Sequence, residues 1–253
     1  DVNEDGHPDA VVANFYGNVS VFLGTGTGTF GSQTQYYAGV TPISVALGDV
    51  DRDGDLDVVG CNYNGFSMFV LKGNGTGAFG PPVFYGASTY SRSVSLGDVD
   101  EDGWLDVVVA NVQGPTVSVF LNDGDGTFAP QISLFTPPYA DHATTVDVNG
   151  DGHLDIAVAQ GAEKIGVILG NGDGTFQPMR QFPAADSVAF VTAGDLDGDG
   201  RPDLVATNPF QDFVSVYLNK ITGSFVGEVA TIVQPFPRVT AIALAGSPPP
   251  YAT

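Results

Sequence analysis

The sequence predicts an all-β fold, and three observations support this prediction. The 253-residue chain contains 34 Gly and 17 Pro, which is typical of a protein with many tight turns and little helix. Its apolar residues occur in short runs bounded by Gly, Asn and Pro, which are strand signals, and no stretch keeps a helical period. Hydrophobic residues make up 43% of the chain, so the strands can bury a core of ordinary size.

One acidic motif recurs five times along the chain. It reads DVNEDGHPDAVVAN from Asp1, DVDRDGDLDVVGCN from Asp49, DVDEDGWLDVVVAN from Asp98, DVNGDGHLDIAVAQ from Asp147 and DLDGDGRPDLVATN from Asp195. A Gly-rich motif such as NDGDGTF travels with it, and a segment such as ISVALGD precedes each of the four later copies. A constant period of 48 or 49 residues marks a tandem repeat.

Each repeat predicts four short antiparallel strands. Strand one is of the ISVALGD type and leads into the acidic loop, and strand two is the LDVVVAN type that follows it. Strand three is of the VSVFLN type, and the Gly-rich hairpin leads to strand four, as in FAPQISLF. Tandem four-stranded units of this length are typical of a β-propeller. We therefore predict a single domain over residues 1–253, an all-β, five-bladed β-propeller of four-stranded antiparallel blades.

The two ends of the sequence predict how the propeller closes. The loop at Asp1 has no strand before it, whereas RVTAIALAGS at residues 238–247 matches strand one but has Ser247 where an acidic loop would begin. We predict that this C-terminal strand completes the blade begun at the N-terminus. The alternative is that the repeats form part of a seven-bladed propeller.

The acidic loops have the form D-x-[D/N]-x-D-G-x-x-D, which predicts calcium sites. Ca²⁺ takes six to eight oxygen ligands in flexible geometry, and alternate side chains on a tightly curled backbone converge on one point. Gly at position six allows the sharp turn, and position seven offers its carbonyl oxygen. The predicted side-chain ligands of up to five structural calcium ions are Asp1, Asn3, Asp5, Asp9, Asp49, Asp51, Asp53, Asp57, Asp98, Asp100, Asp102, Asp106, Asp147, Asn149, Asp151, Asp155, Asp195, Asp197, Asp199 and Asp203.

Two other interpretations of these loops are weaker. An EF-hand closes with Glu at position twelve and continues into a helix, but position twelve here is Val, Gly or Ala and a strand follows. The loops could instead be Asp-rich turns held only by side-chain to backbone hydrogen bonds. However, 21 of the 29 acids lie in the five loops, where like charges repel. Of the five sites we expect the first to be the loosest or the one left empty, because Asp1 would bind beside a charged amino group if no residue precedes it.

The formal charge of −21 also limits the partners of the protein. It argues against nucleic acid and anionic membrane surfaces, because phosphate binding needs clustered Lys and Arg. No run of 18 apolar residues occurs, so we expect no membrane insertion. Cys61 is the single cysteine, and its strand-like surroundings predict a buried thiol and no internal disulfide.

Strand direction alternates, so the connections fall on two opposite faces. One face carries the acidic loops and Gly-rich hairpins. The other, the variable face, carries the two-to-three turns such as NFYGN and the crossings between blades such as FTPPYADHA. Function usually lies on variable loops of a rigid scaffold, and aromatic rings stack on the C–H faces of sugars. We predict ligand contacts there, although several of these side chains could simply cover blade edges: Tyr16, Tyr63, Phe66, Tyr90, Arg92, Tyr139, His142 and Phe210.

No catalytic residue is predicted. A polysaccharide lyase needs a base and a charge-neutralising group at one point. The residues available for these roles form no recognisable motif: Arg92, Lys164, Arg180, His142 and Tyr139. A binding module is therefore favoured, and a lyase or other carbohydrate-active enzyme on the same scaffold is the alternative. Trp104, at position seven of its loop, is expected to pack over a neighbouring blade.

The repeats resemble the FG-GAP and VCBS repeats of integrin α subunits and of many secreted bacterial proteins. The acidic-loop pattern carries this resemblance, and its five copies cover nearly the whole chain. The resemblance implies a secreted or cell-surface, calcium-stabilised propeller that binds glycans or an extracellular protein. The integrin propeller has seven blades, however, and the FG pair survives only in TFGSQ and AFGPP. The partners of integrins are therefore not carried over.

Overall fold

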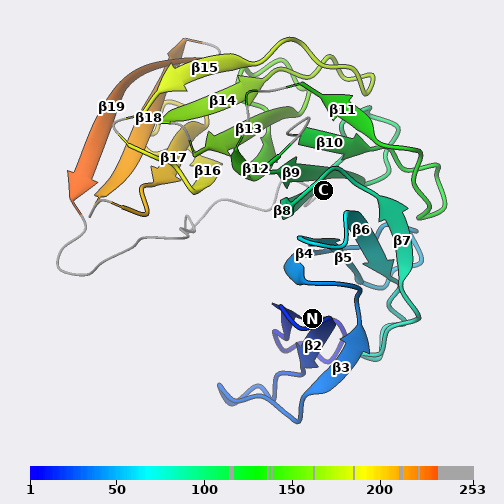
Figure 1. The fold of residues 1–253 in the computed structure, drawn as a ribbon. Coiled ribbons are helices and arrows are strands. Elements are labelled where there is room, and N and C mark those ends of the chain that lie inside the picture. Colours follow the sequence, from blue (N-terminus) through cyan, green and yellow to red (C-terminus); the bar gives the residue numbers. More distant parts are fainter. Residues whose placement is uncertain are drawn as a thin grey trace.

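The computed structural model of the chain describes residues 1–113, 117–135, 137, 139–161, 163–184, 186–210, 213–221 and 223–232. In these residues all regular structure is β-strand, and five antiparallel sheets follow one another along the chain. The sheets stand side by side in an arc (Figure 1). No helix of this described part is long and apolar enough to cross a membrane. The all-β prediction is confirmed, whereas the closing strand at 238–247 lies outside the described residues.

The sheets contain the strands that the repeats predict, in the predicted order. The first sheet has β1 Ala10–Asn14, β2 Asn18–Phe22 and β3 Thr34–Tyr37. The second has β4 Pro42–Gly48, β5 Asp57–Asn62, β6 Ser67–Leu71 and β7 Val83–Gly86. The third has β8 Ser91–Gly97, β9 Asp106–Asn111, β10 Val117–Phe120 and β11 Ile132–Leu134. The fourth has β12 Ala140–Val146, β13 Asp155–Gln160, β14 Lys164–Ile168 and β15 Arg180–Pro183. The fifth has β16 Phe190–Gly194, β17 Asp203–Thr207, β18 Phe213–Ile221 and β19 Ser224–Ile232.

The first strand of each four-stranded sheet lies toward the middle of the arc, and the fourth strand lies outside (Figure 1). Strands β4, β8, β12 and β16 contact one another in that order. The next strands, β5, β9 and β13, are buried over all six residues. Both faces of these strands are covered by neighbouring sheets, which explains why the residues between the polar ends of each strand are continuously nonpolar and not alternating.

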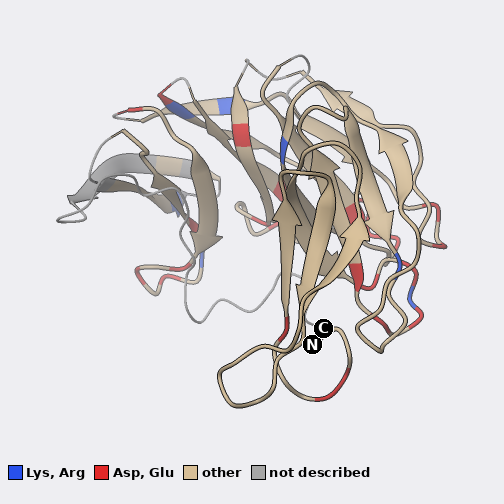
Figure 2. Cartoon of the chain, turned by 60° about the horizontal axis from the view of Figure 1, so that its bottom comes forward, with Lys and Arg blue, Asp and Glu red and all other residues tan. Residues whose placement is uncertain are grey.

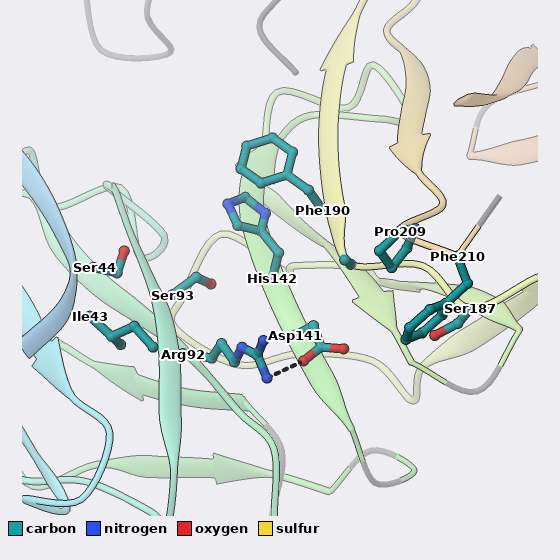
Figure 3. Close-up of a pocket in the computed structure, with 11 residues that line it drawn as sticks. Ile43, Ser44, Arg92, Ser93, Asp141, His142, Ser187, Phe190, Pro209 and Phe210 are labelled. Carbon is teal, nitrogen blue, oxygen red and sulfur yellow. Dashed lines mark ion pairs between the residues drawn. The ribbon is translucent and has the colours of Figure 1, made fainter. Parts of the chain in front are cut away.

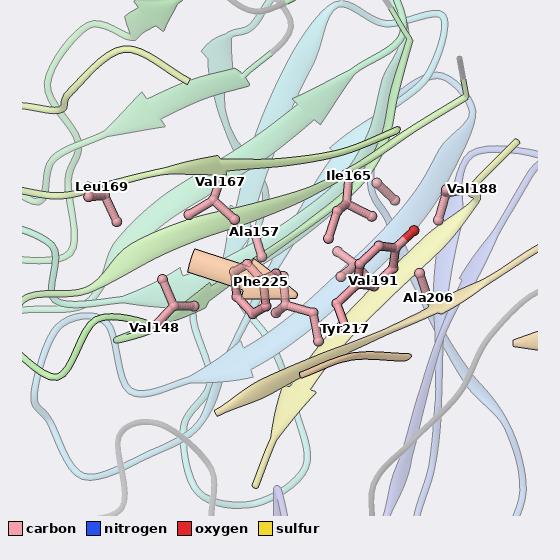
Figure 4. Packing of buried hydrophobic residues seen from close by; sticks show 12 residues of the cluster. Val148, Ala157, Ile165, Val167, Leu169, Val188, Val191, Ala206, Tyr217 and Phe225 are labelled. Atoms are coloured by element: carbon pink, nitrogen blue, oxygen red, sulfur yellow. The ribbon is translucent and has the colours of Figure 1, made fainter. Parts of the chain in front are cut away.

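The core is divided into four clusters of apolar side chains, one between each pair of consecutive sheets. Figure 4 shows the cluster between the fourth and fifth sheets, in which Ile165 and Val167 face Val191 and Tyr217. Burial of each large apolar side chain contributes about 1.5–3 kcal/mol, so each sheet depends on its neighbours for most of its stability. Cys61 is fully buried in one of these clusters, and burial raises the pKa of its thiol to about 12. The predicted buried thiol is confirmed.

A hydrogen bond repeated in four places also joins consecutive sheets. The carbonyl of position two in an acidic loop accepts a hydrogen bond from a donor in the hairpin of the next sheet. Val2 O accepts from Gly77 N at 2.9 Å, and Val99 O accepts from Gly174 N at 3.4 Å. Val50 O and Val148 O accept instead from the side-chain amides of Asn122 and Asn219, at 2.8 and 2.5 Å. The acidic loops are thereby part of the joint between sheets.

The first sheet differs from the others because it has three strands in the described part of the chain. None of the five residues of β1 is fully buried, whereas all five residues of the equivalent β17 are. The missing position in this sheet is that of strand one. This is the position that the predicted strand at residues 238–247 would fill.

Candidate functional site

The acidic loops are held in a tight curl by their own carboxylates. The side chain of position one accepts the backbone N–H of the Gly at position six, as between Asp49 and Gly54 at 3.0 Å. The side chain of position five accepts the N–H of position seven, as between Asp102 and Trp104 at 2.8 Å. The Gly at position six has a φ of 81–98° in all five loops, which favours glycine strongly. Most acidic residues lie on loops at one end of the sheets (Figure 2).

In three loops the carboxylates converge closely enough to share a cation. Three carboxylate oxygens lie within 4.8 Å of one another in each of these groups: Asp49, Asp51 and Asp53; Asp98, Asp100 and Asp106; Asp195, Asp197 and Asp199. Asp51 Oδ1 and Asp98 Oδ1 are buried and accept no hydrogen bond in the described structure. A buried anionic oxygen without a donor is costly. These groups of hard carboxylate oxygens therefore fit a hard divalent cation as its ligands.

The carboxylate at position nine has a second role that the sequence pattern did not reveal. One oxygen of Asp106 accepts the N–H of Val99 in its own loop, and the other accepts the N–H of Asn122 in the following hairpin, both at 2.8 Å. Asp57 and Asp155 make the same pair of contacts. Burial, with the nearby loop carboxylates, raises the pKa of Asp106 to about 7 and the pKa of Asp57 and Asp155 to about 6.

Neighbouring acidic loops also contact one another through positions four and seven. The guanidinium of Arg52 lies 4.7 Å from the ring centre of Trp104 in the next loop, which confirms that Trp104 packs over a neighbouring blade. Glu101, at position four of its loop, is paired with His153, at position seven of the following loop, and this pairing raises the pKa of the histidine. Asp197 of the fifth loop is paired with Lys220 of β18.

On the variable face, the structure separates the eight predicted ligand residues into groups. Tyr90 lies between Tyr63 and Phe66, with ring centres 5.0 and 5.9 Å away. Tyr16 is 94% exposed and packs edge-on against Phe15, 5.8 Å away. Tyr139 is half exposed and precedes β12.

The remaining three residues, Arg92, His142 and Phe210, line one pocket of about 520 Å³ (Figure 3). It is formed where the inner strands begin, together with the turns that precede β16 and follow β17. The Arg92 guanidinium pairs with Asp141 Oδ1 at 3.1 Å, between the third and fourth sheets. The other lining residues are Ile43, Ser44, Ser93, Ser187, Ala189, Phe190 and Pro209.

His142 is the least accessible of the predicted ligand residues in this pocket. Its ring stacks on Phe190 with a centroid distance of 3.8 Å, and burial lowers its pKa to about 4. The imidazole is therefore neutral near pH 7. Its position at the wall of the pocket suits a packing role or a neutral hydrogen bond better than a positive charge.

Asp141 and Ser187 are pocket residues that the sequence analysis did not single out. Asp141 lies outside the acidic loops, so the repeated acidic motif does not include it. Its partner Arg92 belongs to the preceding repeat, so no local pattern joins them. One available signal was position: Asp141 stands at the same place in its repeat as Arg92 does.

The fold and the loops together place this chain in a class, the tandem-repeat proteins whose four-stranded sheets are joined through acidic loops. The sequence model described as FG-GAP-like repeat matches residues 1–60, 49–109, 98–158 and 147–206. The matches together span residues 1–206, so the chain belongs to the FG-GAP-like repeat family. A comparison with curated proteins finds no match.

Several solved structures share the fold at low sequence identity. A lectin from Agrocybe aegerita that recognises non-reducing terminal N-acetylglucosamine aligns with a TM-score of 0.65, at 22% identity and over 92% of this chain. The biofilm matrix protein Bap1 of V. cholerae aligns with a TM-score of 0.54, at 20% identity and over 94% of this chain. BBS1N, solved in complex with ARL6DN, aligns with a TM-score of 0.53, at 14% identity and over 78% of this chain. The alignments span 65%, 39% and 56% of those chains, respectively.

Proposed function

We propose that this chain is a calcium-stabilised, extracellular binding module that recognises a glycan or a protein partner through its variable face. The calcium is structural, with up to five ions in the acidic loops. The observation that carries the binding proposal is the group of accessible aromatic side chains on the face opposite the loops. Phe66, Tyr139 and Phe210 are 47%, 51% and 70% exposed, although aromatic side chains contribute most stability when they are buried.

The calcium part of the proposal is supported by electrostatics. Clustered carboxylates, including the buried and unpartnered Asp51 Oδ1 and Asp98 Oδ1, are costly without a cation. The loops join consecutive sheets through their position-two carbonyls, so an ion bound to a loop stabilises the joint between sheets. Millimolar extracellular Ca²⁺ fills weak sites of this kind, which supports a secreted or cell-surface location.

The ligand class is supported by the comparisons. Two of the solved structures that share the fold are a lectin and a biofilm matrix protein, and both favour a carbohydrate or extracellular partner. BBS1N was solved in complex with ARL6DN, which keeps a protein ligand as the second candidate. The charge of −21 disfavours nucleic acid in either case.

A polysaccharide lyase has less support. Among its candidate residues, His142 is buried with its pKa lowered to about 4, and Arg92 is paired with Asp141. Lys164 begins β14 and Arg180 begins β15, and neither lines the pocket. Release of unsaturated product from polyuronates, followed by ultraviolet absorbance, would revive this alternative.

A glycan array, probed with and without a calcium chelator, tests the proposed function. We expect binding in calcium and its loss in EGTA, because chelation loosens the joints that position the variable loops. Binding that is unchanged in EGTA would show that calcium is not needed to position the variable loops. No glycan binding in calcium would leave the protein partner as the proposed ligand.

A further inference from the structure

The pocket at the start of the inner strands is built by a repeated backbone irregularity. The register of β4, β8 and β12 shifts at their second residue, which leaves Ile43, Arg92 and Asp141 as bulge residues at equivalent positions. A β-bulge redirects a side chain away from the regular alternation of a strand. All three bulge residues line the pocket.

Backbone strain accompanies each bulge. Thr41, Tyr90 and Tyr139, two residues before the bulge residues, have positive φ values of 62°, 59° and 75°. A positive φ is unusual for any residue other than Gly, and most of all for a bulky one. Such strain is kept where the surrounding structure requires it. The same strained turn therefore presents three chemically different side chains, apolar, cationic and anionic, to one cavity.

The charges of the pocket cancel. Arg92 and Asp141 form an ion pair in which the arginine side chain is 46% exposed and the aspartate 19%. An ion pair that is open to water contributes little to stability. It does, however, place hydrogen-bond donors and acceptors side by side. Adjacent hydroxyl groups of a sugar require this combination, since each hydroxyl both donates and accepts.

Apolar side chains flank the pair on two sides (Figure 3). Phe210 and Pro209 lie on one side of Arg92 and Asp141, and Ile43 lies on the other. Pockets of 300–1,000 Å³ with a few convergent polar groups are typical of small-ligand sites, and the volume here is about 520 Å³. An exposed ring such as Phe210 offers a surface for the C–H face of a sugar.

We propose that this pocket is the primary saccharide site and that it binds a short neutral glycan, with Arg92 and Asp141 hydrogen-bonding to adjacent hydroxyls and Phe210 packing on the sugar ring. This inference rests on the proposed function, because it selects the site and ligand class within the variable face. An acidic glycan fits poorly, since Arg92 is already neutralised and Asp141 would repel a carboxylate.

The test uses the full calcium-loaded chain and a panel of neutral and uronate- or sialate-bearing glycans, followed by titration of the best binder. The pocket variants are Asp141→Asn and Phe210→Ala. The matched controls are Asp123→Asn, an exposed acid in a hairpin, and Phe135→Ala, an exposed ring outside the pocket. Tyr16→Ala tests the rest of the variable face. The melting temperature of each variant separates loss of folding from loss of binding.

We expect a neutral glycan to bind, and each pocket variant to weaken its binding about tenfold or more, with the two controls unchanged and Tyr16→Ala weakening binding less than either pocket variant. If glycan binding is lost in Tyr16→Ala but kept in the pocket variants, the pocket inference fails and the proposed glycan function stands. Preference for acidic glycans overturns the ligand class. If no glycan binds, the inference and the glycan function fail together.

Discussion

Asp106 shows how one side chain connects two parts of a blade. Its two oxygens accept the N–H groups of Val99 and Asn122, and its carboxylate also belongs to a candidate cation site. The acidic-loop pattern predicts only the cation site. The two hydrogen bonds explain why position nine is acidic in all five repeats, and they predict an effect that does not depend on calcium.

Replacement of Asp106 by Asn places an NH₂ group against one of the two N–H donors. In EGTA at pH 8, Asp106→Asn should lower the free energy of unfolding by about 1–3 kcal/mol, the cost of a buried donor without an acceptor. Chemical denaturation measures this loss, and Asp123→Asn, which removes an exposed acid, is the control. If the variant and the wild type have the same free energy of unfolding in EGTA, Asp106 acts only as a cation ligand.

His142 predicts a pH dependence of stability. Its pKa is lowered to about 4 in the folded state by burial, compared with about 6.5 in the unfolded chain. The unfolded state therefore takes up the proton more readily, so the contribution of this residue is complete above pH 6.5 and is lost as the pH falls toward 4. The loss is about 1–3 kcal/mol, allowing for partial exposure of the ring.

Denaturation curves of wild type and His142→Gln at several pH values measure this contribution. The stability difference between the two proteins should change in favour of the variant as the pH falls from 7 to 4. Carboxylate titration is common to both proteins and cancels in the comparison. A difference that stays constant across this range would mean that the histidine titrates normally.

At the scale of elements, the strands are predictable because the same order of apolar runs and turn residues occurs in each repeat. The runs around β5, β9 and β13 are continuously apolar, and Gly, Asn or Asp bounds each of them. The bulges at Ile43, Arg92 and Asp141 are not predictable, because one unpaired residue near the start of a strand leaves the later alternation unchanged. Because the pocket depends on these bulges, the sequence predicted ligand contacts on the variable face but did not predict the pocket itself.

The exposed edge of β1 predicts where the C-terminal segment lies. Its residues are less buried than those of β5 or β17, and the sequence at 238–247 matches the strand that this sheet lacks. If the segment pairs with β1, the amides of Ala10–Asn14 that face it should exchange with solvent slowly.

Ile242→Pro tests this pairing, because proline removes a donor and disrupts a strand. Hydrogen exchange measured by mass spectrometry should show faster exchange over β1 in this variant, with β9 unchanged. Pro249→Ala, which lies beyond the predicted strand, is the control. Fast exchange of β1 in the wild type would contradict closure by the C-terminal strand.

At the scale of the whole molecule, stability comes from the joints between sheets. Four apolar clusters and the hydrogen bonds to the acidic loops span these joints. A cation bound in a loop would therefore stabilise two sheets at once. It would also relieve repulsion in a chain whose formal charge is −21.

The melting temperature with and without calcium tests the central claim most directly. At free Ca²⁺ ten times above Kd, each filled site contributes about 1.4 kcal/mol, and 1 kcal/mol corresponds to about 2–4 °C for a domain of this size. Even if only the three closely clustered loops bind, the melting temperature should rise by about 8 °C or more over the value in EGTA. Mg²⁺ at the same concentration should have a smaller effect, because it requires near-ideal octahedral geometry. An unchanged melting temperature in calcium and in EGTA would contradict the account.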